Sequence, residues 1–491
     1  MSASNQFALL GQRRFAPFFW TQALGAFNDN VFKNALVILL AFLTVELDSR
    51  AVNFYTNLAA GLFILPFLLF SATSGQLSDK FDKARLAQFV KGLEIAIMLI
   101  GTAGFVMHSI PLLLAMLFMM GLHSTLFGPL KYGLLPQVLD ERELIGGNGL
   151  IEMATFLAIL LGTILGSSLI RVDSIGAWLV GASTVGIALA GLATALAMPK
   201  APAVDPGLRL NWNPLSETWR NLNHLRDNRT VFLSCLGISW FWFYGSIYFT
   251  QLPNYTKEVL GGDPGVYTLL LTVFSVGIGL GSLLCERLSG HKVEIGLVPL
   301  GSIGMTLFGV DLYFAHPGLA AEHGLGAATL VARPGIWRVL VDLFGMAVFS
   351  GFFTVPLFAL IQARSEPARR SRVIAANNIL NALFMVVAAA LSAVLLNVAG
   401  LSIPGLLLAT AVLNALVAIY IYGLVPEFLM RFLSWLLVSA LYRIRTEGLA
   451  RIPEDGPVLL VCNHVSFVDA LILGGAVRRP VRFVMYYRIF D

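Results

Sequence analysis

Residues 75–83 read GQLSDKFDK, a short charged stretch between two long apolar segments. Gly75 allows a neighbouring helix to approach closely at the membrane surface, because glycine has no side chain. Asp79 can then accept hydrogen bonds from the N-terminal end of that helix, or pair with a basic residue. The stretch therefore predicts a latch between two membrane helices. The alternative is a solvated loop whose charges have no partner in the bundle.

A weaker copy of this stretch occurs later in the chain and favours the latch. Residues 281–292 read GSLLCERLSGHK, and Glu286 and Arg287 stand there in the places of Asp79 and Lys80. The copy predicts that the chain contains two similar halves.

A second pair of related stretches points to the same repeat. The first runs from Pro129 to Asn148 and the second from Pro356 to Asn378. Parallel repeats of this kind are typical of one large class of secondary transporter.

The composition indicates a polytopic membrane protein. The chain of 491 residues is 57% hydrophobic and only 12% charged, whereas soluble domains carry roughly 25% charged residues. Its mean hydropathy is +0.78. No basic cluster is interleaved with aromatic residues, so we expect no nucleic-acid partner. Cys235, Cys285 and Cys462 have neither metal-site nor disulfide spacing, and we expect no metal and no cofactor.

We expect an all-α membrane domain of twelve transmembrane helices, because each crossing of the bilayer core needs about 20 apolar residues. The segments lie near residues 16–43, 53–77, 86–107, 110–137, 146–169, 175–198, 231–256, 265–285, 293–315, 336–361, 373–397 and 401–424. The predicted domains are an N-terminal six-helix half (1–198), a cytoplasmic linker (199–230), a C-terminal six-helix half (231–425), an interfacial helix (426–445) and a soluble tail (446–491).

Basic residues predict the orientation of these helices. Lys80, Lys83, Arg364 and Arg369 are among the many that fall in loops on the side of the N-terminus, and the opposite loops hold few. By the positive-inside rule, both termini and the tail face the cytoplasm.

The first predicted helix carries a polar run in mid-span, GAFNDNVFKNAL, which holds Asn28, Asp29, Asn30, Lys33 and Asn34. A charge at the bilayer centre costs at least about 2.5 kcal/mol, so the run must face protein or water. Asp29 and Lys33 are four residues apart and can neutralise each other as a structural ion pair. We favour a polar substrate site or gate, because the asparagines add hydrogen-bonding capacity.

Further charges lie in the next predicted helices. Lys131 faces the interior of the bundle or extends to the membrane surface. Glu152 falls one turn into the fifth helix. Lys91 and Glu94 lie one turn apart and are expected to form a superficial pair near the cytoplasmic end.

These stretches resemble a known family. Residues 75–83 resemble the loop signature of the major facilitator superfamily, although Asp82 stands where that signature has glycine. FNDN, FGPLKYGLLP and NGLIE resemble the lysophospholipid transporter family within it, over residues 15–425. That resemblance implies a flippase in the bacterial inner membrane, which moves lysophosphatidylethanolamine-type lipids to the inner leaflet for re-acylation.

The resemblance also implies roles for individual residues. Asp29 would accept from the ammonium of a zwitterionic headgroup, and Lys131 would donate to its phosphate. The predicted substrate-binding residues are Asn28, Asp29, Lys33, Lys131, Asn148, Glu152 and Asn378. The predicted gating loop consists of Gly75, Asp79, Lys80, Glu286 and Arg287.

The tail resembles a second family. The segment GPVLLVCNH has the pattern of a turn and a buried strand, DALILGGAV that of a short helix and PVRFVMYY that of a second strand. The sequence from 447 to 473 resembles the start of a glycerolipid acyltransferase, an α/β domain with the signature Asn-His-x-x-x-x-Asp. The resemblance makes His464 the general base for the lysolipid hydroxyl and Asp469 its partner.

Later motifs of that family have no room before Asp491. We expect an incomplete, inactive acyltransferase domain, belonging to a longer fusion or to a truncated product. Acyl-CoA or acyl carrier protein would be a partner only of the completed domain. Lysophospholipid and membrane lipids are the other expected partners.

Three functions remain open. The chain is a lysolipid flippase, a proton-coupled antiporter of small molecules or drugs with Asp29 or Glu152 as proton carrier, or an acyltransferase with a membrane anchor. Charges in mid-span count against a mere anchor. The tail favours the flippase, because lysolipid would be both cargo and acyl acceptor.

Overall fold

The computed structural model describes most of the chain. The described residues are 6–40, 49–289, 296–315, 324–424, 430, 433–434, 437–438, 441–453, 456–463, 465–466, 468–477 and 481–484.

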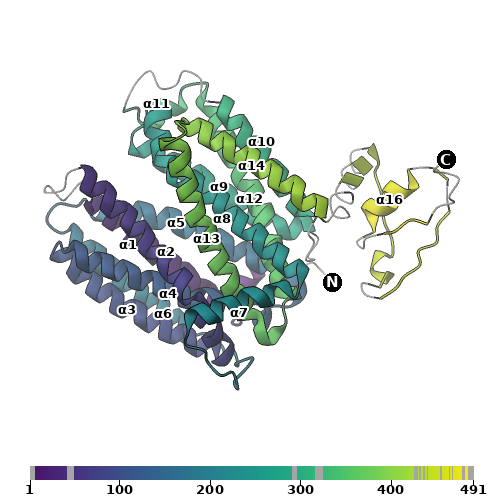
Figure 1. The fold of residues 1–491 in the computed structure, drawn as a ribbon, viewed down its shortest axis with the longest axis horizontal. Helices are drawn as coiled ribbons and strands as arrows, with labels where there is room; N and C mark the ends of the chain where they lie inside the picture. The colour runs from purple at the N-terminus through teal and green to yellow at the C-terminus, as the bar shows by residue number, and fades with distance from the viewer. Residues whose placement is uncertain are drawn as a thin grey trace.

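Twelve long helices form the body of the described chain, six in each half (Figure 1). The first six are α1 (Ala16–Ile38), α2 (Ser49–Lys80), α3 (Lys83–Val106), α4 (Ile110–Val138), α5 (Leu144–Leu169) and α6 (Gly176–Leu196). The second six are α8 (Arg229–Asn254), α9 (Pro264–Ser289), α10 (Leu297–Phe314), α12 (Ile336–Arg364), α13 (Arg370–Asn397) and α14 (Ile403–Leu424). The predicted all-α fold of two six-helix halves is confirmed.

Eleven helices within the described ranges are long and apolar enough to cross a membrane, and α1 is not among them. The reason is the polar run from Asn28 to Asn34, which lowers the hydropathy of a helix that is otherwise rich in Phe, Leu and Val. The remaining short elements are η1 (Gln6–Gly11), η3 (Glu141–Glu143), α7 (Pro214–Arg226), η4 (Tyr255–Val259), α11 (Ala327–Val331), η6 (Pro367–Arg369), η7 (Leu449–Arg451) and α16 (Asp469–Ala476).

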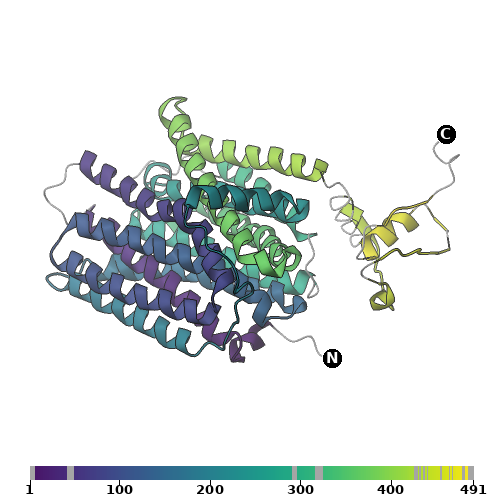
Figure 2. The same cartoon turned by 60° about the horizontal axis from the view of Figure 1, so that its bottom comes forward.

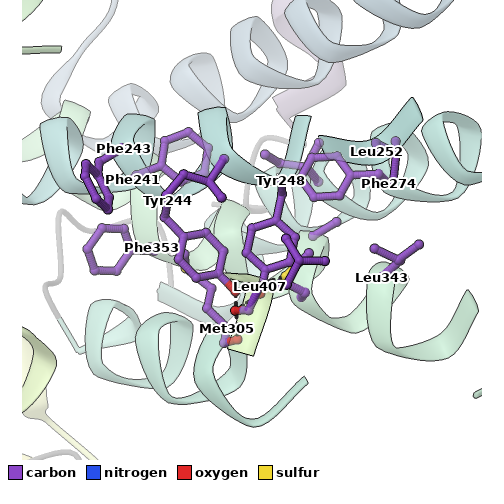
Figure 3. Packing of buried hydrophobic residues seen from close by; sticks show 14 of the residues in the cluster. Phe241, Phe243, Tyr244, Tyr248, Leu252, Phe274, Met305, Leu343, Phe353 and Leu407 are labelled. Carbon is purple, nitrogen blue, oxygen red and sulfur yellow. Dashed lines mark hydrogen bonds between the residues drawn. The ribbon is translucent and has the colours of Figure 1, made fainter. Parts of the chain in front are cut away.

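The two halves meet where α2 packs on α13 and α5 packs on α9. Figure 2 shows the two halves side by side, the first in purple and blue and the second in teal and green. The second half has a core of buried aromatic residues, in which Tyr244 and Tyr248 of α8 stack on each other (Figure 3). Their hydroxyls donate to the carbonyls of Met305 and Leu407, so these polar tips tie α8 to α10 and α14.

The segment between the halves contains a helix that its polar sequence did not predict. In α7, Asn213 caps the first turn by accepting from the amides of Leu215 and Ser216, and Pro214 occupies the first helical position. The helix packs against α2, α8 and α13 and lies across one end of the bundle (Figure 1). We call this the linker end.

Asp82, which departs from the loop signature, also has a structural role at the linker end. One carboxylate oxygen accepts from the amide of Arg85 and caps α3, and the other accepts from the amide of Ala201 in the linker. The carboxylate of Asp82 therefore fastens the linker to the loop between α2 and α3.

The described segments after residue 430 lie to one side of the bundle (Figures 1 and 2). The predicted tail helix is confirmed as α16. The predicted strands are absent from the described residues of the tail, where the segment 457–463 has no regular secondary structure and Leu459 and Val461 are exposed. A segment without a neighbouring strand cannot make ladder hydrogen bonds. Most of the predicted interfacial helix lies outside the described residues.

Candidate functional site

A buried charged network joins α1, α3 and α4. The carboxylate of Glu94 accepts from Asn28 Nδ2 at 2.7 Å and from Lys91 Nζ at 2.6 Å. His123 Nε2 lies 3.2 Å from the same carboxylate, but it is not aligned for a hydrogen bond, and neither ring nitrogen has such a partner among the described residues. A carboxylate with a cation and an amide donor is stable in this setting, because its charge is both balanced and hydrogen-bonded.

The predicted position of the Lys91–Glu94 pair is wrong. The pair forms, but each side chain is only 1% exposed, so it is not superficial. Gly25 of α1 leaves room for the ammonium, since a Cβ atom there would collide with Lys91 Nζ, whereas one at Gly191 of α6 would make only an ordinary contact with the Lys91 side chain. The present position of Lys91 therefore depends in part on a glycine in another helix.

Asp29 faces α4 rather than the network of Glu94. Its carboxylate accepts from Ser124 Oγ at 2.5 Å, and its Oδ1 atom is buried without a hydrogen-bond partner in the described part of the chain. Lys33 lies over the ring of Phe63, with 5.5 Å from its Nζ to the ring centroid. No ion pair between Asp29 and Lys33 occurs within the described ranges, so these two side chains do not neutralise each other as a structural pair.

Lys131 points into the bundle. Its Nζ atom donates to Thr155 Oγ1 of α5 at 3.2 Å and lies 4.8 Å from the ring centroid of Tyr132. Tyr132 in turn donates to the buried carboxylate of Glu152 at 2.5 Å. Lys131 follows Ser124 by seven residues, which places it on the same face of α4, about 10 Å along the axis.

Asn148 connects the two halves. It exchanges two hydrogen bonds with Gln362 of α12, one from Asn148 Nδ2 to Gln362 Oε1 at 2.7 Å and one from Gln362 Nε2 to Asn148 Oδ1 at 3.0 Å. The side chain of Asn378 in α13 occupies the space beside Gly128 of α4. Both predicted asparagines therefore lie at contacts between the halves.

The charged loop meets the start of α13. Asp79 accepts from the backbone amide of Ser371 at 3.2 Å and from Arg372 Nε at 3.0 Å, and its side chain is fully buried. A Cβ atom at Gly75 would meet Ala375 and the backbone of Arg372, so only glycine lets the helices come this close. An acid, a helix N-terminus and a guanidinium thus hold α2 to α13 at the linker end.

The second copy makes a related contact between α9 and α5. Glu286 accepts from the backbone amide of Gln6 at 3.1 Å and fills the space beside Gly146 in the first turn of α5. Arg287 is exposed, whereas Lys80 donates to the carbonyl of Leu208 in the linker.

The predicted catalytic pair of the tail can be placed only in part. His464 lies outside the described residues. Asp469 begins α16, and its carboxylate accepts from the amides of Val465 and Ser466 at 2.6 and 2.8 Å. These bonds fix the turn that follows residue 464.

His123, Gln362 and Arg372 are among the residues at these contacts that the sequence did not predict. A histidine in an apolar span is a detectable signal for the first. Arg372 and Gln362 could not be assigned, because their partners lie hundreds of residues away in the chain.

Comparisons with known proteins agree with this arrangement. The Major Facilitator Superfamily profile matches residues 19–322, and the Acyltransferase profile matches residues 443–491. The chain is 27% identical over 350 residues to a lysophospholipid transporter LplT of Serratia proteamaculans (strain 568), and 30% identical over 357 residues to one of Escherichia coli O7:K1 (strain IAI39). Each match covers 70% of this chain and 79% of the relative.

The fold is also shared with solved transporters. The proton:xylose symporter XylE superimposes with a TM-score of 0.63 at 15% identity, over 86% of this chain and 96% of that one. The chain belongs to the major facilitator superfamily and, within it, to the family of the lysophospholipid transporters, and an acyltransferase-like segment follows its last membrane helix.

Proposed function

We propose that this transporter moves lysophospholipids such as lysophosphatidylethanolamine from the outer to the inner leaflet of the bacterial inner membrane. Two similarities support the proposal. The membrane domain is related to lysophospholipid transporters, and the segment after it is similar to acyltransferases. A transporter joined to an enzyme family that acylates lysolipids would supply the substrate of that enzyme.

The observation that carries the proposal is the separation of unlike charges along α4. Asp29 lies beside Ser124 with one carboxylate oxygen unpartnered, and Lys131 lies about two turns further along the same face. A zwitterionic headgroup needs an acceptor for its ammonium and a donor for its phosphate, and these two side chains offer one of each. Lys33 adds a second cation near Asp29.

The network of Glu94 supports this site by positioning. Asn28 is held by Glu94 while the next residue, Asp29, faces α4. Since Lys91 balances the charge of Glu94, that carboxylate is satisfied inside the protein. Asp29 is thereby left as the carboxylate with spare hydrogen-bonding capacity.

The roles of the inter-half residues form part of the proposal. Gly75, Asp79, Lys80, Glu286 and Arg287 would control closure at the linker end, and Asn148 and Asn378 would line the path between the halves. Glu152, bonded to Tyr132, would tune Lys131. The basic loops at the linker end favour a cytoplasmic location for that end and for both termini.

The tail would complete the sequence of events in a full-length acyltransferase domain. His464 would take the proton of the lysolipid hydroxyl while the oxygen of that hydroxyl attacks the acyl thioester of acyl-CoA or acyl carrier protein. The C–O ester bond forms, the C–S bond breaks, and the proton passes to the leaving thiolate. Asp469 would orient the base through the turn that it fixes.

Uptake of lysophosphatidylethanolamine into proteoliposomes tests the proposed site. Asp29→Asn and Lys131→Ala should each lower the initial rate at least about tenfold, because a charge-assisted hydrogen bond to the headgroup is lost. The matched controls are Asp173→Asn and Lys257→Ala, which remove exposed charges in the turn before α6 and in η4. Wild-type rates in both site variants would remove the site, and transport that occurs only with a pH gradient and only of small molecules would favour the antiporter.

A further inference from the structure

We propose that a cavity at the linker end is a binding site for a phosphate group, separate from the site on α4. The cavity has a volume of about 340 Å³ and lies between α7, α8, α12 and α13. This volume falls within the range of small-ligand pockets and exceeds what a single water molecule needs. A phosphate group would bind here whichever molecule the transporter carries.

Guanidinium groups dominate the lining. Arg364, Arg369 and Arg372 contribute three positive charges, and Asp227 and Glu366 contribute two negative ones. Both carboxylates already have a neighbouring partner in the lining. Asp227 lies 3.3 Å from His224, and Glu366 lies 3.6 Å from Arg369.

Arg364 has spare capacity for a ligand. In the described part of the chain its guanidinium takes part in no ion pair, although its backbone carbonyl accepts from Asn228. A guanidinium presents several N–H donors in a planar fork, which matches two oxygens of a phosphate. The most available cation of the cavity is therefore the residue type that binds phosphate best.

A buried amide without a partner is the second, independent observation. Asn221 of α7 lines the cavity and is only 1% exposed, yet neither its Nδ2 nor its Oδ1 atom has a hydrogen-bond partner among the described residues. A buried amide is destabilising unless something supplies the missing bonds. Both amide atoms are closed to solvent in this conformation, so the side chain would rotate toward the cavity before a bound phosphate accepts from Nδ2.

The cavity shares one residue with the contact between the halves. Arg372 lines the cavity, and its Nε atom donates to Asp79 of α2. The other cavity walls come from the linker and the second half. A bound phosphate would compete with Asp79 for Arg372, so its binding would weaken the attachment of α13 to α2.

Thermal unfolding of the purified full chain in detergent tests the site. Inorganic phosphate, titrated against chloride at matched ionic strength, should raise the unfolding midpoint in a saturable way. Arg364→Gln and Arg369→Gln should weaken the apparent phosphate affinity at least about tenfold, through loss of charge-assisted hydrogen bonds. Arg85→Gln, an exposed residue on α3 outside the cavity, is the matched control and should behave as wild type.

Two additions make the result decisive. Asn221→Leu should raise the midpoint without phosphate and reduce the phosphate response, whereas a purely structural asparagine would lower the midpoint. Dioctanoyl phosphatidic acid then tests a lipid headgroup as the source of the phosphate, and inorganic phosphate tests the free ion. Dioctanoylglycerol is the control, because it has the same acyl chains and no phosphate. Saturable stabilisation by either phosphate source, lost in the arginine variants, supports the site. Equal responses in all variants, or none from either source, would show a cavity that holds water only and overturn the proposal.

Discussion

Arg372 Nε donates to Asp79 Oδ2 at 3.0 Å and joins the first turn of α13 to the last turn of α2. The two residues are 293 positions apart in the chain and belong to different halves. Asp79 also accepts from the amide of Ser371, so one buried carboxylate is bound to a guanidinium and to a helix N-terminus. This contact, together with that of Glu286 against α5, fastens the halves at the linker end.

The energy of this contact is measurable by a double-mutant cycle. Arg372→Ala should lower stability strongly when Asp79 is present, because a buried carboxylate loses its counter-charge, and much less in an Asp79→Asn background. We expect a coupling energy of about 1–3 kcal/mol from unfolding of the four proteins. Strictly additive effects of the two substitutions would contradict an energetic link between these side chains.

Gly75→Val should separate α2 from α13, since the added side chain would collide with the α13 backbone. Cysteines at positions 78 and 371 report the separation, because the two native serine oxygens lie 3.1 Å apart. In a Cys462→Ser background, the cross-linking yield should fall sharply with Gly75→Val. Gly61→Val on the same helix, where the new Cβ meets nothing, should leave the yield unchanged. If the yield with Gly75→Val is as high as with Gly61→Val, the close approach at Gly75 is dispensable.

Lys91→Met should destabilise the first half by about 3–5 kcal/mol, because it leaves the buried carboxylate of Glu94 without its cation. The double variant Lys91→Met/Glu94→Gln should recover a large part of that loss, since no unpaired charge remains. Thermal unfolding midpoints of the single and double variants provide the comparison. A double variant that is less stable than Lys91→Met alone would contradict the role of Lys91 as counter-ion.

Asn148→Leu should cost about 1–3 kcal/mol, because it leaves the amide of Gln362 buried without its partner. The double variant Asn148→Leu/Gln362→Leu should be less damaging than either single change, since both polar groups are removed together. If the three variants lose stability in simple proportion to the number of substitutions, the reciprocal pair does not act as a unit.

The sequence predicts the membrane helices well because their signal is local. Segment length and apolar composition located eleven of the twelve long helices, and α1 was placed correctly although its polar run makes it less apolar than the others. The ends of α4 and α13 fall within a few residues of the expected positions. The helix α7 was missed because its sequence is polar. Its signal is the cap formed by Asn213 and Pro214, followed by the buried face of Glu217, Asn221 and Leu225.

The candidate site was predictable in its residue types but not in its pairings. The polar run of α1 marks a buried site, yet nothing in it shows that Asn28 turns to Glu94 while Asp29 turns to Ser124. The position of Lys91 depends on the room that Gly25 leaves on another helix. Such contacts depend on how helices distant in sequence pack, and one helix's pattern does not contain that information.

The proposed cargo is a single-chain phospholipid. The most direct test of this proposal presents labelled lysophosphatidylethanolamine to the outer face of proteoliposomes that hold the full chain, with diacyl phosphatidylethanolamine as the comparison. We expect the lysolipid to reach the inner leaflet faster than in protein-free vesicles, the diacyl lipid to show no such increase, and Asp29→Asn to abolish the difference. Equal transfer of lysolipid with and without the protein would rule out this cargo.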